Sequence, residues 1–441
     1  MNIQTINRCD QRAREILQKN DRGNYTVPTD GLYPFQWNWD SALVALGFSA
    51  FDPDRAWREI ETLLSAQWDD GMVPHIIFWK DDEGYFPGPD EWGTGTSPKT
   101  SGITQPPLAA TIVRELLGRA GEKMHSRAIP LIIALNRWHQ WFSDARDPDG
   151  RGLVAIIHPW ESGRDNLPDW DKPLARVDTS RVGSYSRRDT QHVHEDERPK
   201  KLDYDRYMAL VQFGRHNDWD PEIIARDNPF WVADVGMNAI LRRAEHDLVH
   251  AAETLGLNHV AVEARARAQR LDAGFEALWS EQLGGYVSLD LRHNERAQAL
   301  TAGTFLAFYA SNTPDLHAQR MLDTFHLWSA RVRYGVPSFD PTSELFDSIR
   351  YWRGPVWAII NWMIANGLER NGYEKLATRI HKDTQNLICN EGFYEYFCPL
   401  TGRGMGGDAF SWTAAAWLAW GSPNAPISER SLEEKPENSG T

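Results

Sequence analysis

Residues 158–171 read HPWESGRDNLPDWD, and no other stretch of the chain gathers so many acids and indoles into so few positions. Gly163 and Pro168 disfavour a regular helix through this stretch, so we expect a loop that presents carboxyl groups beside flat apolar walls. A carboxyl group held against an indole ring loses hydration, which favours its neutral form and raises its pKa. A general acid needs such a pKa near neutral pH. The alternative is an acidic surface turn with tryptophans beneath it.

The composition of the chain is acidic and rich in tryptophan. Its 441 residues carry a formal net charge of −14 and include 20 tryptophans. No basic stripe stands out, and nucleic-acid binding is disfavoured because it needs clustered Lys and Arg to neutralise phosphates. Indole faces stack on the C–H faces of sugars while carboxylates and amides bind hydroxyls, so we expect a neutral polyol ligand. Core packing is the alternative role for most of the tryptophans.

The cysteines and the first residues bear on the cellular compartment. Cys9, Cys389 and Cys398 form neither the even framework of a disulfide scaffold nor the paired motif of a zinc ribbon, and they fit a reducing compartment. The first five residues contain no apolar stretch, and no later run approaches the roughly 18 apolar residues of a membrane helix. We therefore expect a cytoplasmic protein with no membrane contact, no metal and no cofactor. A homo-oligomer stays open as an alternative to a monomer.

Helical periodicity dominates the chain, and the predicted strands are few and short. Apolar spacing predicts an opening helix over 6–19 and, later in the chain, helices over 232–255, 258–280, 296–309, 314–328 and 373–389. Asp40 is a candidate N-cap of a helix over 41–48, and Tyr351 is expected to begin a helix that reaches about residue 366. No βαβ alternation occurs, which disfavours a parallel sheet. Helix pairs joined by short turns around a centre predict an all-α toroid with a concave site at one end.

Two long irregular segments, about 71–104 and 172–230, interrupt the predicted helices. The first is rich in Gly, Pro and Trp, and the second carries a charged run over 195–201. Long loops in compact domains are functional or disordered as a rule, and the aromatic residues argue against disorder. We expect one catalytic domain over 1–423 with these two segments as inserted lids. Residues 424–441 are charged and nearly free of apolar side chains, so we expect a disordered tail there.

Several separated motifs resemble those of one enzyme family. The sequence ESGRDN at 161–166, with Trp-Asp at 170–171, resembles the acid-bearing motif of the inverting glycoside hydrolases of family 63 and the related trehalases. The sequence YEYF at 394–397, followed by FSWTA at 410–414, resembles the base-bearing segment of that family. Gln-Pro-Pro at 105–107 and YWRGPVW at 351–357 also resemble family signatures, so the resemblance spans about residues 30–420.

The resemblance implies a fold and a narrower branch of the family. Members of the family share an (α/α)6 barrel, which implies short β-hairpins and long inserted loops around the helical toroid. Larger members carry a β-sandwich domain before the barrel, and a chain of 441 residues has no room for one. The chain therefore resembles the compact bacterial branch, the mannosylglycerate and glucosylglycerate hydrolases. These enzymes imply a small-molecule glycoside as substrate, cleaved at an α-glycosidic bond to an acidic aglycone.

The same resemblance assigns the catalytic pair. Asp165 matches the general acid, which protonates the glycosidic oxygen, and Glu395 matches the general base, which deprotonates a water on the opposite face of the sugar. Inversion implies roughly 6.5–9.5 Å between the two carboxyl groups, whereas about 5 Å implies retention through a covalent intermediate. We expect Asp165 to be desolvated with a raised pKa, and Glu395 to be ionised and hydrogen-bonded.

Predicted sugar-binding residues come from several motifs. Asp40, with Trp39 and Tyr33, is expected to bind hydroxyls of the sugar that is cleaved, because a dry carboxylate discriminates strongly between epimers. The remaining candidates for this subsite are Gln105, His75, Tyr351 and Trp352. Packing at a helix start is the alternative role for Tyr351 and Trp352.

An acidic aglycone would need a cation and hydrogen-bond donors. An Arg and a Tyr clamp the acid in glycerate-specific relatives, and Arg198 and Tyr204 are similar in spacing. A solvated charge run is the alternative for this stretch. Tyr85, in the other long segment, is expected to close over the same ligand.

Other functions stay open at this level. An α-glucosidase or trehalase-like hydrolase would act on neutral oligosaccharides with the same catalytic pair. A non-catalytic sugar-binding toroid would leave the acids without a catalytic role. An isomerase or epimerase on the same barrel would need catalytic histidines, for which His75 and His158 are the candidates. The preference for a gluco or a manno configuration is open as well, since one pocket residue can change it.

Overall fold

The computed structural model describes residues 2–82, 84–187, 189, 193–310 and 313–426. Helices dominate these residues, and each strand is only two or three residues long. Within this part of the chain, no helix combines the length and the apolar character needed to span a membrane. Most of the predicted tail, residues 427–441, lies outside the described residues.

An inner layer of helices closes into a ring. In chain order its members are α2 (Asn38–Phe48), α5 (Ala109–Ala120), α11 (Val235–Thr254), α13 (Ala302–Ala310), α15 (Ala358–Arg370) and α17 (Ser411–Ala416). Each contacts the next, and α17 contacts α2. Every residue of α2, α13 and α17 is buried, because an inner helix has neighbours on all sides.

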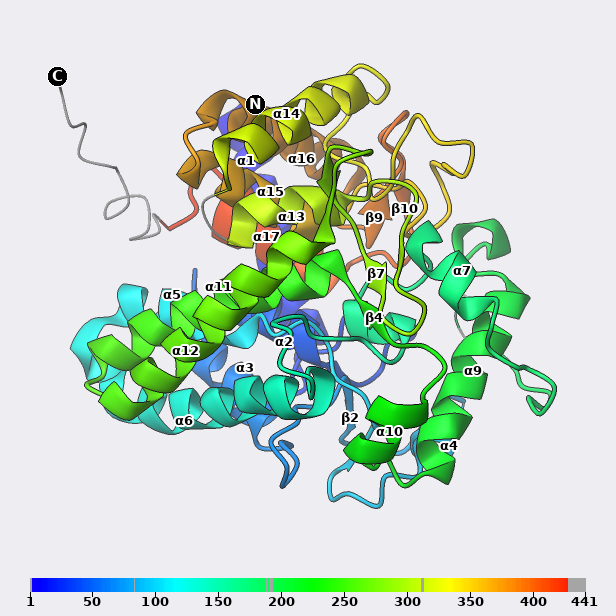
Figure 1. Ribbon diagram of the computed structural model, residues 1–441. Coiled ribbons are helices and arrows are strands. Elements are labelled where there is room, and N and C mark those ends of the chain that lie inside the picture. The colour runs from blue at the N-terminus through cyan, green and yellow to red at the C-terminus, as the bar shows by residue number, and fades with distance from the viewer. Residues whose placement is uncertain (1, 83, 188, 190–192, 311–312, 427–441) are drawn as a thin grey trace, which may run out of the picture.

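An outer layer alternates with the inner one along the chain. Its members are α1 (Ile3–Asn20), α3 (Pro53–Leu64), α6 (His125–Trp141), α12 (Asn258–Phe275), α14 (Asp315–Ser329) and α16 (Glu374–Glu391). These helices bury one face only, as their amphipathic spacing predicts. Asp52 caps α3 by accepting a hydrogen bond from the amide of Arg55, with Pro53 in the first turn. The alternating layers form an (α/α)6 barrel, which confirms the predicted helical toroid (Figure 1).

Short antiparallel strands lie in the connections between helices. One sheet has the order β1 (Gln36–Trp37), β2 (Ile76–Phe78) and β3 (Lys99–Thr100), and another has the order β4 (Val232–Ala233), β7 (Leu289–Asp290) and β8 (Glu295–Arg296). Two hairpins join β5 (Trp279–Ser280) to β6 (Gly285–Tyr286) and β9 (Tyr396–Phe397) to β10 (Gly404–Met405). In the first sheet Gln36 lies opposite Ile77, which connects the segment before α2 to the segment before α5.

The two inserted segments pack against each other. Segment 71–104 contains the single helical turn α4 (Pro89–Trp92), which contacts α9 (Lys201–His216) of segment 172–230. Trp219 of the second segment donates a hydrogen bond from its indole nitrogen to the carbonyl oxygen of Trp92, at 2.9 Å. The second segment is partly helical, since α7 (Asp171–Leu174) and α10 (Pro221–Asp227) accompany α9 (Figure 1).

Three predicted helix starts are wrong. Trp37 is the N-cap of α2, and Asp40 lies inside the first turn. Helix α15 begins at Ala358, because Tyr351 has φ +47°, in the left-handed region that an α-helix excludes. The helix expected from residue 296 begins at Ala302, since Arg296 belongs to β8 instead. The later starts of α15 and α13 lengthen the connections into these two inner helices, whereas α2 begins earlier than predicted.

Candidate active site

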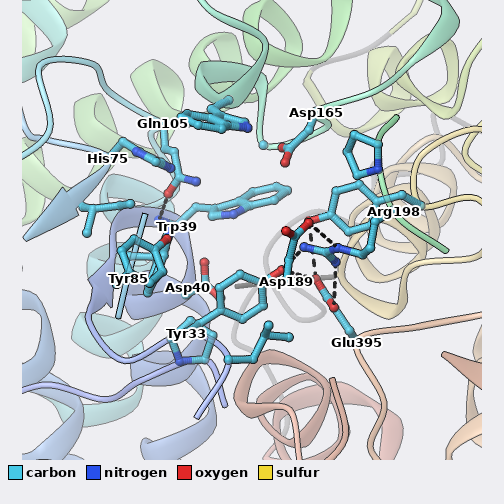
Figure 2. Close-up of a pocket in the computed structure, with 18 of the residues that line it drawn as sticks. Tyr33, Trp39, Asp40, His75, Tyr85, Gln105, Asp165, Asp189, Arg198 and Glu395 are labelled. Carbon is cyan, nitrogen blue, oxygen red and sulfur yellow. Dashed lines mark hydrogen bonds and ion pairs between the residues drawn. The ribbon is translucent and has the colours of Figure 1, made fainter. Parts of the chain in front are cut away.

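A cavity of about 100 Å³ lies at the end of the barrel where several inner helices begin. Its walls come from the connections into α2, α5, α15 and α17, from the 158–171 loop, and from both inserted segments. The predicted site residues that line it are Tyr33, Trp39, Asp40, His75, Tyr85, Gln105, Asp165, Arg198, Tyr204, Tyr351 and Glu395. Figure 2 labels all of these except Tyr204 and Tyr351. Sequence motifs far apart in the chain therefore meet around one cavity.

Trp352 is the predicted site residue that the cavity lining does not include. Its ring stacks on Trp357 with 3.7 Å between ring centroids, and it lies behind Trp39 at 6.4 Å. The side chain is 1% exposed. Trp352 thus supports the wall that Trp39 presents, which agrees with the packing alternative.

Asp189 lines the cavity although no sequence pattern marked it. Its carboxylate accepts hydrogen bonds from Arg198 Nε at 3.2 Å and from Arg187 Nη2 at 2.6 Å. The residue follows an irregular, charged stretch without periodicity, and its partner Arg198 is nine positions later. Only the tertiary fold brings these charges to the cavity.

Local turns hold the acid-bearing loop against the barrel. Residues 159–162 form a single 3-10 turn, which His158 caps by accepting a hydrogen bond from the amide of Trp160 at 3.0 Å. Gly163 follows with φ +65°, and a Cβ atom there would lie 2.5 Å from the ring of Trp39. Glycine is therefore required for both its backbone conformation and its close contact with the cavity wall.

Glu161, the first acid of the motif, fixes the loop through buried hydrogen bonds. Its carboxylate accepts hydrogen bonds from Arg146 Nη2 at 3.0 Å, from the amide of Thr104 at 3.2 Å and from the amide of Ile157 at 2.8 Å. The side chain is 1% exposed. These contacts satisfy both of its oxygens, so Glu161 has a structural role.

A second buried network holds the far side of the loop. Arg164 forms an ion pair with Asp234, which also caps α11 by accepting from the amides of Gly236 and Met237. Ser288 donates a hydrogen bond to Asp169 at 2.8 Å. Burial raises the pKa of Asp169 to about 7, with Ser288 opposing the shift and the charge of Asp234 adding to it.

Asp165 differs from the other acids of the loop because it faces the cavity (Figure 2). Tyr207 fixes its backbone by donating to its carbonyl oxygen at 2.8 Å. The carboxyl group is partly exposed to the cavity, but the surrounding protein desolvates it and raises its pKa to about 7. Arg198 opposes this shift and the charge of Glu395 adds to it. Among the described residues, no side chain donates a hydrogen bond to this carboxyl group.

Glu395 approaches the cavity from the opposite side (Figure 2). Its Oε1 accepts from the hydroxyls of Tyr33 at 3.1 Å and Tyr351 at 3.4 Å. Its Oε2 accepts from the amide of Gly407 at 3.1 Å and from Arg198 Nη1 at 3.4 Å. The side chain is 1% exposed, in contrast to the surface acid that a strand end alone would give.

The pKa of Glu395 shifts in a direction that the sequence did not predict. Burial raises it above the ordinary value of a glutamate, whereas Arg198 and the donated hydrogen bonds oppose that shift. The expected hydrogen bonding of Glu395 is present, but its pKa is raised. Desolvation therefore raises the pKa of both Asp165 and Glu395, and the two carboxyl groups differ in their hydrogen-bond partners.

Arg198 connects the second inserted segment to this site. Its guanidinium lies 4.2 Å from the ring centroid of Tyr351 and reaches both Glu395 and Tyr33. The side chain is 4% exposed, which excludes a solvated charge run for this residue. Tyr204, in the same segment, donates from its hydroxyl to the carbonyl oxygen of Phe86 at 3.4 Å, and this contact joins the two segments at the cavity lining.

Polar groups on the remaining wall sit beside Trp39. Gln105 accepts a hydrogen bond from the amide of Trp39 at 3.3 Å. Asp40 is 4% exposed, and burial followed by the charge of Glu395 raises its pKa well above the ordinary value. Asp40 and Gln105 thus present polar atoms next to an indole face.

The two histidines are uncharged near neutral pH. Burial lowers the pKa of His75 well below its ordinary value, and its ring stacks on Trp160. Burial lowers the pKa of His158 to about 3, and its two ring nitrogens contact the carbonyl oxygen of Tyr207 and the amide of Trp160. His158 is not among the lining residues, so the structure does not bring the two histidines together at the cavity.

Comparison with known proteins places the chain in a family. The family described as "Mannosylglycerate hydrolase MGH1-like glycoside hydrolase domain" matches residues 33–413. The chain is 46% identical to mannosylglycerate hydrolase MGH1 of Selaginella moellendorffii over 95% of this chain and 86% of that protein. It is 47% identical to a mannosylglycerate hydrolase of Thermus thermophilus over 93% and 99%, and 34% identical to a glucosylglycerate hydrolase of Mycolicibacterium hassiacum over 93% and 96%.

A solved structure supports the same assignment. A family 63 mannosylglycerate hydrolase of Thermus thermophilus, in complex with Tris and D-glycerate, superposes with a TM-score of 0.90 at 46% identity. The match covers 92% of this chain and 98% of the other. These findings confirm the resemblance to family 63 that the separated motifs indicated. The chain belongs to the mannosylglycerate hydrolase MGH1-like family and is a glycoside hydrolase.

Proposed function

We propose that this enzyme hydrolyses the α-glycosidic bond of mannosylglycerate, glucosylglycerate or both, with inversion, to release a hexose and glycerate. The observation that carries the catalytic assignment is the position of Asp165 and Glu395 on opposite sides of one cavity, with unlike hydrogen-bond partners. The names of the similar proteins supply the substrate class. In this proposal the carboxyl groups stand at the inverting separation of roughly 6.5–9.5 Å once substrate is bound.

Asp165 acts as the general acid. Its raised pKa, about 7, leaves a large fraction of the group protonated near neutral pH, which is the form that can donate to the glycosidic oxygen. The ion pair of Arg164 with Asp234 holds the neighbouring residue, so the Asp165 carboxyl group keeps its direction into the cavity. A partly exposed position toward the cavity lets it meet the leaving oxygen.

Glu395 acts as the general base. Hydrogen bonds from Tyr33, Tyr351 and Gly407 stabilise the carboxylate form, and Arg198 adds a positive charge beside it. These contacts oppose desolvation and keep enough of the group ionised to accept a proton from water. The water then attacks the anomeric carbon from the face opposite to Asp165.

Asp40, Trp39 and Gln105 form the subsite for the hexose. The buried Asp40 carboxyl group can pair with sugar hydroxyls beside the indole of Trp39, and a sugar with the wrong configuration would leave it unpaired. His75 and Tyr351 complete the walls of this subsite. Trp352 contributes only by supporting Trp39.

Arg198 and Tyr204 bind the glycerate carboxylate. Arg198 is held by Asp189, and its charge acts on Asp165 as well as on Glu395, so its guanidinium is near enough to the leaving group to contact an anion there. D-glycerate is present in the similar Thermus thermophilus structure. Tyr85 lines the same cavity from the other inserted segment and closes over the ligand.

The two inserted segments, 71–104 and 172–230, act as lids of a single catalytic domain over 1–423. The cavity of about 100 Å³ is smaller than the roughly 300–1,000 Å³ of ordinary ligand pockets. Arg198 and Tyr204 line it from one segment and Tyr85 lines it from the other. Substrate entry therefore requires these segments to separate. The hydrogen bond between Trp219 and Trp92 holds the two segments together in the closed form.

Substrate class is tested by comparing mannosylglycerate, glucosylglycerate and trehalose in the same hydrolysis assay. We expect turnover of at least one glycosylglycerate and little turnover of trehalose. Preference for trehalose or another neutral oligosaccharide would favour the trehalase-like alternative, and no turnover of any sugar would favour a binding protein.

The carboxylate clamp is tested with Arg198→Ala. This substitution also removes an interaction with Glu395, which affects every substrate alike. The decisive quantity is the ratio of kcat/KM for a glycosylglycerate to kcat/KM for a neutral glycoside, and we expect it to fall about tenfold or more. Lys201→Ala, which removes an exposed cation paired with Asp205, is the control. An unchanged ratio would exclude the clamp.

A cytoplasmic location is part of the same proposal. Cys9, Cys389 and Cys398 form no disulfide in the structure, which fits a reducing compartment. Fractionation of cells that produce the full-length protein would test this expectation directly.

A further inference from the structure

Two cysteines from opposite ends of the chain meet on the outside of the barrel. Cys9 lies on α1 and Cys389 on the last turn of α16, 380 positions apart in sequence. Their sulfur atoms are 3.2 Å apart, so the thiols are in direct contact. The third cysteine, Cys398, is buried after β9 and belongs to neither helix. The pairing has no sequence motif, because the outer layer of the barrel alone creates it.

This thiol pair opens onto a second cavity, distinct from the active site. The cavity has a volume of about 540 Å³ and lies between α1, the end of α16 and residues 408–409. Both Cys9 and Cys389 line it, together with Arg8 and Arg12. Cys9 is 6% exposed and Cys389 is partly exposed. A small solute in this cavity can therefore reach the sulfur atoms.

The surroundings make the two thiols unequal. The contact with the Cys389 thiol lowers the pKa of Cys9 against the effect of burial, and the charge of Arg8 lowers it further. The same contact and burial raise the pKa of Cys389. The pKa of Cys9 is therefore lower than that of Cys389, which favours Cys9 as the attacking thiol and Cys389 as the resolving thiol.

We propose that Cys9 and Cys389 form a redox modification site that closes to a disulfide when a small hydroperoxide enters this cavity. The Cys9 thiolate attacks one peroxide oxygen, the O–O bond breaks, and water leaves after protonation, which gives a sulfenic acid. The Cys389 sulfur then attacks the Cys9 sulfur, an S–S bond forms, and the sulfenic oxygen leaves as water. In total, two thiols are oxidised and one peroxide is reduced.

The disulfide joins the first outer helix of the barrel to the last one. It closes a covalent loop over nearly the whole chain, and long loops give the largest loss of entropy in the unfolded state. The disulfide would also restrain α1 next to the segment that carries the base. Asn20 of α1 donates hydrogen bonds to the carbonyl oxygen of Ala409 and to the hydroxyl of Ser411, both at 2.9 Å. Residues 407–411 follow directly from the amide that holds Glu395.

The test uses the reduced full-length protein, treated with a small excess of hydrogen peroxide and then with a thiol-alkylating reagent. Mass spectrometry of the intact protein and of its peptides measures the product. We expect a mass loss of two hydrogens, a linked pair of peptides carrying Cys9 and Cys389, and reversal by dithiothreitol. We also expect the melting temperature of the oxidised form to rise by about 5 °C.

Substitutions separate this site from unspecific oxidation. Cys9→Ser and Cys389→Ser should each abolish the intramolecular disulfide and the rise in melting temperature, and Cys398→Ser should leave both unchanged. Peptide mapping of the oxidised protein without substitutions gives the same test even if a variant fails to fold. Oxidation of single cysteines to sulfonic acids without a Cys9–Cys389 link, or a link that involves Cys398, would overturn the proposal.

Discussion

The two carboxyl groups at the cavity lie in regions that differ in where their hydrogen-bond donors are placed. In the 158–171 loop, the polar partners serve Glu161 and Asp169, while Asp165 faces the cavity with its pKa raised to about 7. In the 394–411 region, the donors converge on Glu395 itself. Burial raises the pKa of both groups, so burial alone does not distinguish an acid from a base. The placement of hydrogen-bond donors distinguishes them.

The largest expected effect comes from removing either carboxyl group. Asp165→Asn and Glu395→Gln should each lower kcat by about 10²–10⁴-fold, because each removes one proton-transfer step. The fold should stay intact, as measured by circular dichroism and melting temperature. Glu391→Gln, an exposed acid near the base segment, is the control and should keep full activity. Near-normal turnover in either catalytic variant would break the assignment of the pair.

Asp169 is a buried carboxyl group without a catalytic role, and its raised pKa affects the stability of the fold. Its pKa is about 7 in the folded protein and near 3.8 when unfolded, so the native state binds more protons between about pH 4 and pH 7. The contribution of this group to stability is therefore lost as the pH rises through about 7, on the order of 4 kcal/mol in all. Asp169→Asn should be more stable than the unsubstituted protein at pH 8 and similar at pH 4, in denaturant titrations at both pH values. The same pH dependence in both proteins would contradict this.

Each region also contains a glycine with positive φ that lies close to a side chain of the cavity. A Cβ atom at Gly406 (φ +72°) would collide with Glu395 Oε2, and one at Gly163 (φ +65°) would lie 2.5 Å from Trp39. We expect Gly406→Ala to lower kcat by displacing the base, and Gly163→Ala to raise KM by displacing the cavity wall. Both should cost about 1–3 kcal/mol of stability.

Gly150 provides the matched control for these two substitutions. It has a similar φ of +65°, and a Cβ atom there meets nothing within 4 Å. Gly150→Ala should therefore reproduce the backbone strain without any change in kcat or KM. If all three variants had the same kinetics, the close contacts of Gly406 and Gly163 would have no functional role.

The smallest expected effect concerns one donor to the base. Tyr351→Phe removes a hydroxyl that lies 3.4 Å from Glu395, which raises the pKa of Glu395 because its charged form loses a partner. The acidic limb of the kcat profile should shift to higher pH by about half to one unit. The alkaline limb, set by Asp165 near pH 7, should stay in place. A shift of the alkaline limb instead would reverse the roles of the two groups.

Local sequence signals predicted much of the fold and the site. The helical periods identified α1, α2 and the helices from α11 to α16, and the motifs at 161–166 and 394–397 located residues that meet at the cavity. Spacing could not reveal the closure of the ring, which depends on the contact of α17 with α2. Helix starts failed where left-handed backbone at Tyr351 or a short strand such as β8 came first.

Contacts between distant side chains were the part that the sequence could not provide. Arg198 contacts Glu395 although the two residues are 197 positions apart in sequence. Asp189, which holds Arg198, lies in a stretch without any periodic sequence pattern. Trp352 matched a motif, but only its packing against Trp357 shows that it lies behind the cavity wall. The contact of Cys9 with Cys389 likewise arises from neighbouring outer helices. Each of these features depends on tertiary structure.

The measurement that tests the division of roles most directly is the hydrolysis of an α-glycosyl fluoride by Asp165→Asn and Glu395→Gln. Fluoride leaves without protonation, so this substrate needs a general base and no general acid. We predict that Asp165→Asn hydrolyses the fluoride within about tenfold of the unsubstituted rate, while Glu395→Gln loses about 10²-fold or more. Loss of fluoride hydrolysis in Asp165→Asn together with its retention in Glu395→Gln would contradict the proposed acid and base.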